Sequence, residues 1–335
     1  MIWGAGLPGS TGWPGRDDMN AGTAIAIDLG GTQLRVALVE GNRILDRAAT
    51  ATEPTTGPEA LFDRIDRMID RLCGGRALSE FAGVGMCCAG PINTDTATAT
   101  QIPTLPGLDD VRLGAELSRR TDLPVRIEND GIAAALGEWR HGAGRGARNM
   151  LYLTVSTGIG GGAVIDGRLL RGHRGIAGHI GHMKMTPDGP VCSCGATGCF
   201  EALAAGSALT QRAMAALQTA DSPYLAGAAH DGVVDARDVF SGARAGDAHC
   251  CHLVAEEAMY LGQGITSAIH MFSPERVVLG GGVANGFDLL EEGIHAVIRR
   301  DALVPFRTVP VVMAALGDDS GLMGAASLIL DPQDM

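Results

Sequence analysis

The stretch that decides the fold is AIAIDLGGTQLRVALV, residues 24–39. Its apolar residues 24–27 predict a short buried strand, and residues 34–39 resume the strand pattern after a turn that contains two glycines. The stretch LYLTVSTGIGGGAVI, residues 151–165, repeats this order of strand, glycine-rich turn and strand. Two copies of one unit predict a pair of α/β lobes that face a single nucleotide.

The rest of the chain alternates short apolar runs with stretches of helical spacing. Further strands are expected at residues 43–45, 81–87, 124–130 and 276–279. Helices are expected at residues 60–72, 131–140, 201–217 and 252–271. A final helix is expected to open at residues 317–321, with acidic residues in its first turn.

The composition limits the function classes. The 335 residues are 46% hydrophobic but only 4% aromatic, and the formal net charge is −12. An acidic chain repels phosphate backbones and anionic lipid, so we expect neither nucleic acid nor a membrane as its main partner. The apolar runs fall short of the roughly 20 residues that a membrane helix needs. We therefore expect a small-molecule ligand.

The first residues and the cysteines indicate a compartment. Residues 1–20 are rich in Gly, Pro and Trp and lack the pattern of a secretion signal, so we interpret them as a flexible extension. Eight cysteines without an export signal indicate reduced thiols rather than disulfides. These features predict a cytoplasmic protein.

Glycine-rich turns give the strongest functional signal. Glycines let backbone amides approach an anion, and nearby hydroxyls donate to phosphate oxygens. No Gly-Lys-Ser/Thr follows the first turn, and a strand follows it where a dinucleotide motif requires a helix. The alternative is a set of ordinary hairpin turns. The candidate ATP-binding residues are Asp28, Gly30, Gly31, Thr32, Ser156, Thr157, Gly158, Gly160, Gly281 and Gly282.

These turns, together with the cysteine cluster described below, resemble the ROK family (repressors, open reading frames and kinases) from about Ile25 to Leu330. The resemblance implies the two-lobed actin-like ATPase fold, which is ribonuclease H-like, with ATP and sugar in a cleft between the lobes. It also implies a sugar kinase and a homodimer. The expected small lobe is residues 21–130 plus 318–335, and the expected large lobe is residues 131–317.

Asp130 is the candidate catalytic base. Phosphoryl transfer to a sugar needs one carboxylate that accepts the hydroxyl proton, while Mg²⁺ and amides spread the charge. Asp130 follows a predicted strand, where α/β proteins place ligands, and it matches the family's catalytic aspartate. Asn129 matches the amide that binds sugar hydroxyls, and Asp28 is a candidate for holding Mg²⁺ through water. The alternative is that Asp130 only caps the following helix.

Several positions bear on the choice of sugar. Most kinases of the family carry a glutamate where His179 stands, but bacterial N-acetylmannosamine kinases can have histidine there. Gly90 and Thr104 lie in segments that depart from the glucose-kinase pattern, and Glu201 matches a family carboxylate that reaches the sugar. The alternatives are a surface histidine at 179 and an ordinary first-turn helix glutamate at 201. The candidate substrate-binding residues are Gly90, Thr104, Asn129, Asp130, His179, His182 and Glu201.

A cluster of metal ligands lies in residues 182–199. Cys192, Cys194 and Cys199 place three thiols within eight residues, and His182 precedes them by ten positions. Three thiolates and one imidazole form a closed tetrahedral zinc site of the structural kind. The alternative is three buried cysteines without metal. We expect Zn²⁺ to shape the loop that carries the sugar-binding residues.

The predicted function is phosphorylation of a hexose or amino-hexose at the 6-hydroxyl by ATP, with N-acetyl-D-mannosamine as the leading substrate. A kinase for glucose, glucosamine or kanosamine is the alternative within the same class. A sugar-responsive repressor is the alternative from another class. It is disfavoured because only about two dozen residues precede Asp28, and they show neither helical period nor basic face.

Overall fold

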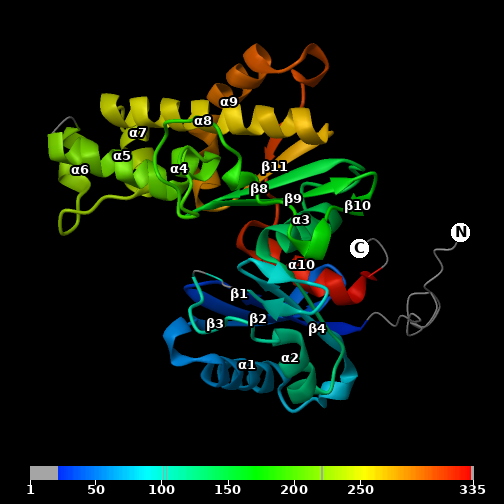
Figure 1. The fold of residues 1–335 in the computed structure, drawn as a ribbon. Coiled ribbons are helices and arrows are strands. Elements are labelled where there is room, and N and C mark those ends of the chain that lie inside the picture. Colours follow the sequence, from blue (N-terminus) through cyan, green and yellow to red (C-terminus); the bar gives the residue numbers. More distant parts are fainter. Residues whose placement is uncertain (1–21, 101, 103, 220–221, 333–335) are drawn as a thin grey trace, which may run out of the picture.

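The computed structural model describes residues 22–332 except 101, 103 and 220–221. The predicted extension at residues 1–20 lies outside the described residues. Two five-stranded sheets lie one above the other, with two helices between them (Figure 1). This architecture confirms the predicted α/β fold.

The first sheet is built on the stretch that opened the sequence. Its strands are β1 (Thr23–Leu29), β2 (Gln33–Glu40), β3 (Arg43–Ala51), β4 (Phe81–Cys88) and β7 (Val125–Asn129). Their order is β3-β2-β1-β4-β7, and β1, β4 and β7 run parallel. Every residue of β1 is buried, as expected for a central strand covered on both faces.

The second sheet repeats the first. Its strands are β8 (Met150–Val155), β9 (Ile159–Ile165), β10 (Arg168–Leu169), β11 (Arg276–Gly280) and β12 (Val311–Met313). Their order is β10-β9-β8-β11-β12, with an antiparallel hairpin on one side of β8 and parallel strands on the other. The duplication inferred from the two glycine-rich stretches is therefore present in the topology.

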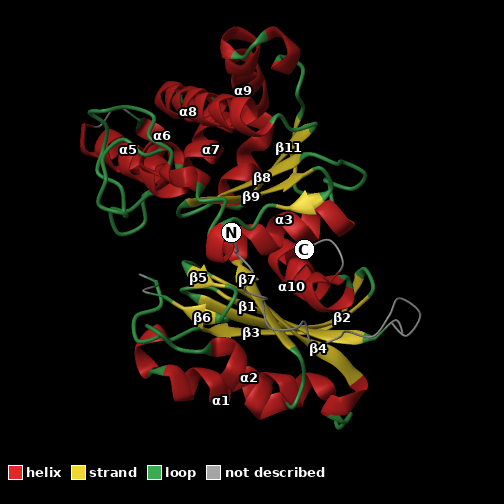
Figure 2. Ribbon diagram, turned by 45° about the vertical axis from the view of Figure 1, so that its right-hand side comes forward, coloured by secondary structure: helices red, strands yellow, loops and turns green. Residues whose placement is uncertain are grey.

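The outer faces of the two sheets carry different helices (Figure 2). Helices α1 (Pro58–Cys73) and α2 (Leu113–Thr121) cover the first sheet, and a short hairpin of β5 (Ile92–Asn93) and β6 (Thr98–Ala99) lies beside it. The second sheet carries α4 (Phe200–Ala204), α5 (Gly206–Thr219), α6 (Pro223–Ala228), α7 (Ala236–Arg244), α8 (Ala248–Phe272) and α9 (Phe287–Asp301). No helix in the described ranges is both long and apolar enough to span a bilayer.

Two helices cross between the sheets. Helix α3 (Asp130–His141) follows the last strand of the first sheet but packs on β8 and β9, whereas α10 (Ser320–Leu330) follows β12 but packs on β1 and β4. The two helices approach each other closely because α10 presents a glycine to α3. A Cβ at Gly324 of α10 would lie 1.7 Å from the Ala133 carbonyl oxygen of α3. This crossing joins the two halves and sets the position of the start of α3.

A buried carboxylate holds the crossing together. Glu138 of α3 has no exposed surface. It accepts hydrogen bonds from the backbone N–H groups of Ala143 (2.8 Å), Ala315 (3.0 Å) and Leu316 (2.8 Å), and from the Ser320 hydroxyl (2.8 Å). These bonds satisfy the charge, as a buried carboxylate requires. They fix the link from β12 to α10 against α3.

Two predicted helix features were wrong. The single helix expected at residues 201–217 is broken at Ala205, whose extended backbone lets the Gly206 N–H donate to the Ser156 carbonyl oxygen (2.7 Å). The acidic residues expected in the first turn of the last helix lie in a preceding 3₁₀ turn, Gly317–Asp319. There Arg47 pairs with Asp319 at 2.5 Å, so the Asp319 carboxylate anchors the turn to β3.

Candidate active site and metal centre

The candidate base stands where β7 turns into α3. The Asn129 side chain caps the helix, because its Oδ1 accepts hydrogen bonds from the N–H groups of Gly131 (3.0 Å) and Ile132 (3.3 Å). Asp130 therefore occupies the first helical position, where its own Oδ1 also accepts a hydrogen bond from the Gly131 N–H (2.8 Å). A Cβ at residue 131 would lie 2.8 Å from backbone atoms of Gly161, so this turn rests directly on β9.

The surroundings of Asp130 change its acidity. Its side chain reaches solvent, yet protein atoms crowd around it, and this burial raises the pKa of Asp130 to about 6. The Gly131 N–H opposes the shift, and the negative charge of Asp28 adds to it. A carboxylate with this pKa is largely ionised at pH 7 and is a better proton acceptor than an ordinary aspartate.

Asp28 is the next-to-last residue of β1, close enough for its charge to act on Asp130. It forms an ion pair with Arg35, whose Nη1 also donates to the Asp318 carbonyl oxygen (2.7 Å). The negative charges of Asp28 and Asp130, after burial itself, raise the pKa of the Cys87 thiol between them. Through Arg35, the carboxylate of Asp28 is thus linked to the 3₁₀ turn before α10.

The first glycine loop brings two predicted sites together. A Cβ at residue 31 would lie 2.7 Å from the Cβ of Thr104, so the glycine lets the Thr104 segment lie against the loop. The Gly30 carbonyl accepts a hydrogen bond from the Thr52 hydroxyl (2.7 Å). Gly31 and Thr32 are exposed or half-buried, which leaves their side of the loop open to a ligand.

The second and third glycine clusters form one surface. The exposed residues Ser156 and Thr157 lie in the turn between β8 and β9. Gly281 has φ +87°, and a Cβ there would lie 2.4 Å from the Val155 carbonyl oxygen. A Cβ at Gly282 would lie 3.8 Å from the Ser156 hydroxyl. Residues far apart in sequence therefore meet around one turn.

Gly160 has a different place from the one predicted. We expected it in a phosphate loop, but residues 160–162 lie inside β9, where Gly160 pairs with Thr154. A Cβ at Gly162 would lie 2.7 Å from the Cβ of Ala135 in α3, and a Cβ at Gly178 would lie 2.5 Å from the Gly161 carbonyl oxygen. The glycines of this strand therefore allow chain segments to pack closely on both of its faces.

Gly90 makes room for the amide of Asn129. A Cβ at residue 90 would lie 2.6 Å from Asn129 Nδ2, so a side chain there would displace the amide. The sequence singled out both residues for the sugar, and the structure brings them together beside Asp130.

Glu201 connects two loops. Its Oε2 accepts a hydrogen bond from the Ile159 N–H (3.0 Å), and its Oε1 accepts one from the Ser193 hydroxyl (2.7 Å). A Cβ at Gly158 would lie 2.5 Å from Oε2, so the glycine makes room for this carboxylate. Glu201 thus links the cysteine loop to the second glycine loop, a role that the sequence did not indicate.

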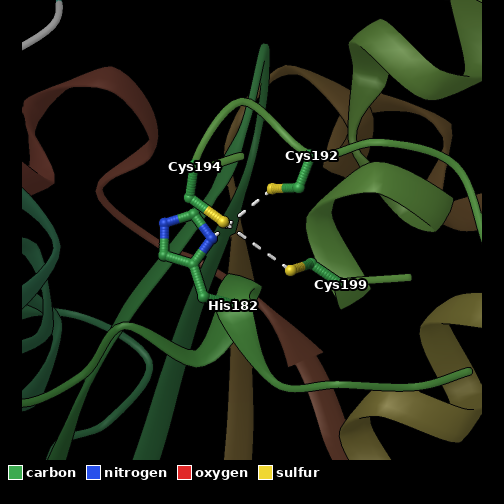
Figure 3. Close-up of side chains that lie close together, drawn as sticks. All are labelled: His182, Cys192, Cys194 and Cys199. Carbon is green, nitrogen blue, oxygen red and sulfur yellow. Dashed lines mark hydrogen bonds between the residues drawn. The ribbon is translucent and has the colours of Figure 1, made fainter. Parts of the chain in front are cut away.

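Four metal-ligand side chains converge in the cysteine loop (Figure 3). The ligand atoms of His182, Cys192, Cys194 and Cys199 all lie within 4.8 Å of one another. His182 Nδ1 is 3.6 Å from the sulfur of Cys192, and the sulfurs of Cys194 and Cys199 are 3.8 Å apart. A tetrahedral zinc ion with Zn–S bonds of about 2.3 Å sets its sulfur ligands about 3.8 Å apart. The donor set and its spacing fit zinc.

The backbone around these ligands is suited to a tight loop. Gly195 has φ +86° and Gly198 has φ +68°, conformations that favour glycine. A Cβ at Gly198 would also lie 1.9 Å from the Thr186 carbonyl oxygen. The N–H of Ala196 lowers the pKa of the Cys194 thiol, which favours the thiolate form that binds metal.

His179 lies beside the candidate metal ligands. Its ring stacks on that of His182, with centroids 6.2 Å apart and an angle of 26° between the planes. Partial burial, and then the neighbouring His182, lower the pKa of His179, which favours the neutral imidazole at pH 7. A neutral ring offers one donor and one acceptor, whereas the glutamate usual in the family offers only acceptors.

Comparison with known proteins supports the resemblance. The family model of the ROK family matches residues 24–332. A glucokinase from Streptomyces coelicolor is 36% identical over 93% of this chain and 98% of its own length. An N-acetylmannosamine kinase from Salmonella heidelberg is 36% identical over 91% of this chain and 98% of its own length. A ROK family glucokinase from Streptomyces griseus, solved with glucose and AMPPNP, is 32% identical with a TM-score of 0.80, over 92% of this chain and 99% of that one. The chain belongs to the ROK family.

Proposed function

We propose that this protein transfers the γ-phosphoryl group of ATP to the 6-hydroxyl of N-acetyl-D-mannosamine. The chain is a sugar kinase of the hexokinase type, as its full-length relatives named glucokinase and N-acetylmannosamine kinase support. The observation that carries the proposal is the environment of Asp130. Asn129 caps the helix, and the carboxylate of Asp130, whose Oδ1 accepts a hydrogen bond from the Gly131 N–H (2.8 Å), still reaches solvent and has a pKa raised to about 6.

The residues around Asp130 take separate roles in the proposed reaction. Asp130 accepts the proton of the 6-hydroxyl as its oxygen attacks phosphorus, and the bond between the γ-phosphorus and the bridging oxygen of ADP breaks. The Asn129 amide orients the sugar. Backbone amides of the two glycine loops hold the phosphates. Bound Mg²⁺ would neutralise charge on the phosphates, with Asp28 as the carboxylate placed to hold it through water.

His179 carries the choice of sugar. The two kinds of named relative are equally similar, at 36% identity each, so overall similarity does not separate glucose from N-acetylmannosamine. The histidine at 179 removes the negative charge that the usual glutamate would present. Its ring is stacked on His182 of the metal centre. We infer that this neutral ring favours the amino sugar, and that glucose is the second candidate.

ADP release with Mg²⁺-ATP tests the proposal. The sugars are N-acetylmannosamine, N-acetylglucosamine, glucosamine, kanosamine, glucose and fructose, and the matched variants are His179→Ala and His179→Glu. We expect the highest kcat/KM with N-acetylmannosamine, and a shift towards glucose in His179→Glu. Equal or better use of glucose by the wild type would contradict the substrate but leave the kinase assignment in place.

The metal, the lobes and the assembly complete the proposal. We infer that His182 and the three cysteines hold a structural zinc ion that shapes the loop between His179 and Glu201, because four protein ligands close the coordination sphere. We also infer lobes of residues 21–130 plus 318–335 and of residues 131–317, which the packing of α3 and α10 supports. A homodimer in the cytoplasm remains the expectation.

A further inference from the structure

Residues 170–182, which we name the strap, run from β10 to the metal centre. At its start the Leu170 N–H donates to the Ala163 carbonyl oxygen of β9 (2.8 Å). At its end a Cβ at Gly181 would lie 2.1 Å from the Ile159 carbonyl oxygen, so the strap returns to the same strand. Both ends are therefore fixed on the second sheet, next to His179 and His182.

The middle of the strap reaches the first sheet. Arg171 Nε lies 2.7 Å from Oε2 of Glu128, a residue of β7 with no exposed surface. The Arg171 side chain is 32% exposed, so the ion pair extends from the surface into the first half of the molecule. Neither atom has a hydrogen bond of good geometry, so charge attraction holds the pair. Removing one partner of such a pair leaves an uncompensated buried charge, which strongly destabilises the folded protein.

A second contact supports the same bridge. The Thr94 N–H, next to β5, donates to the Arg174 carbonyl oxygen of the strap (3.2 Å). A Cβ at Gly175 would lie 2.0 Å from the Thr94 hydroxyl, and Arg174 and Gly175 both have positive φ. The strap therefore bends into an unusual backbone conformation where it meets the first half.

Glu128 connects the strap to the residues proposed to bind the sugar. Glu128 directly precedes the Asn129-Asp130 pair, and its Oε1 accepts a hydrogen bond from the Asn129 N–H (2.9 Å). The same carboxyl group thus contacts the backbone of the sugar-orienting residue on one side and Arg171 on the other. Arg171 stands eight positions before His179 in the strap.

We propose that Arg171 is a positioning residue for the sugar, which through Glu128 holds the strap and its His179 in register with Asn129 and Asp130. This inference rests on the proposed function, which supplies the sugar substrate. Arg171 belongs neither to the glycine loops nor to the candidate metal centre. Because the pair acts on the alignment of two sugar-binding segments, its loss should weaken sugar binding more than it slows phosphoryl transfer.

The test compares Arg171→Gln, Glu128→Gln, the double variant and Arg171→Lys. The matched control is Glu257→Gln, because Glu257 is also a fully buried carboxylate paired with one arginine, Arg212, but lies within α8. With N-acetylmannosamine and glucose as probes, we expect each glutamine variant to raise the sugar KM about tenfold, with kcat and the ATP KM within about threefold. The double variant should resemble the single ones, since they break one pair. Arg171→Lys should recover part of the loss.

Amide hydrogen exchange adds a readout that needs no sugar. We expect residues 172–182 to exchange faster in Arg171→Gln but not in Glu257→Gln, while zinc content by mass spectrometry stays at the wild-type level. An unchanged sugar KM with unchanged exchange in the strap would overturn the inference, as would an equal rise in sugar KM in Glu257→Gln. If the wild type phosphorylates neither sugar, the proposed function fails, and the exchange measurement still decides whether the pair holds the strap.

Discussion

The two strand–turn–strand units look alike in sequence, but their glycines serve different purposes. In the β1–β2 unit, Gly30 and Gly31 lie in the turn itself, where Thr104 lies against Gly31 and the Thr52 hydroxyl donates to the Gly30 carbonyl oxygen. In the β8–β9 unit, residues 160–162 belong to the strand, and α3 covers one side while the strap covers the other. Glycine density therefore signals close packing of backbones as well as phosphate binding, and only the contacts separate the two.

The largest loss of stability should come from a methyl group added to β9. Gly161→Ala would place a Cβ 2.5 Å from the Tyr152 carbonyl oxygen and 3.0 Å from Ile180, so backbone must shift. We expect a destabilisation of about 3 kcal/mol and a Tm lowered by about 5 to 10 °C.

The matched substitution in the first unit is Gly30→Ala, where, among the residues that the structure describes, a Cβ would meet only the Gln33 carbonyl oxygen, at 3.3 Å. Its Tm should stay within about 2 °C of the wild type, because little has to move. Thermal unfolding of both variants decides the comparison, and equal losses of Tm would show that the two sets of glycines are equivalent.

The local patterns of the chain were enough to predict most elements near the site. Apolar runs and turn glycines predicted β1, β2, β4, β7 and β11, and helical spacing predicted α1 and α3. The short helices α2, α6 and α7 were missed, although α7 has a readable signal in its capping box of Asp235 and Asp238. Short helices carry too few turns for a clear apolar period.

What could not be predicted depends on distant contacts. The break at Ala205 follows from the hydrogen bond between Gly206 and Ser156, fifty residues apart. The pairing of Glu128 with Arg171 likewise joins the first sheet to the strap, 43 positions later in the sequence. Sequence spacing pointed to the four side chains that converge as candidate metal ligands, because all four lie within a single short segment.

A smaller effect should come from the side chains that support each glycine loop. Glu201→Ala removes three hydrogen bonds that the carboxylate accepts, one of them from the Ile159 N–H of the second unit. We therefore expect the ATP KM to rise about tenfold. Thr52→Ala removes one neutral hydrogen bond to the Gly30 carbonyl oxygen and should raise it only about threefold. Steady-state kinetics give both values. An unchanged ATP KM in Glu201→Ala would mean that its carboxylate serves the sugar alone.

The smallest expected effect is a shift in the pH at which kcat/KM falls. Asp130 must be ionised to accept a proton, and its pKa is about 6, so kcat/KM should fall below about pH 6 and level off above pH 7. The negative charge of Asp28 raises this pKa, so Asp28→Asn should move the acid limb to lower pH. Ser156→Ala, in the second unit, should leave the limb in place. A limb that moves to higher pH in Asp28→Asn would contradict this account of the coupling.

The most direct test of the central claim is Asp130→Asn, measured both by turnover and by sugar binding. Asparagine keeps the size of the side chain and cannot accept the proton, while Asn129 still caps α3. We predict that kcat falls by about 10² to 10⁴-fold and that the Kd for N-acetylmannosamine changes little. Retained turnover would remove Asp130 from the role of base, and the function proposed here would lose its main support.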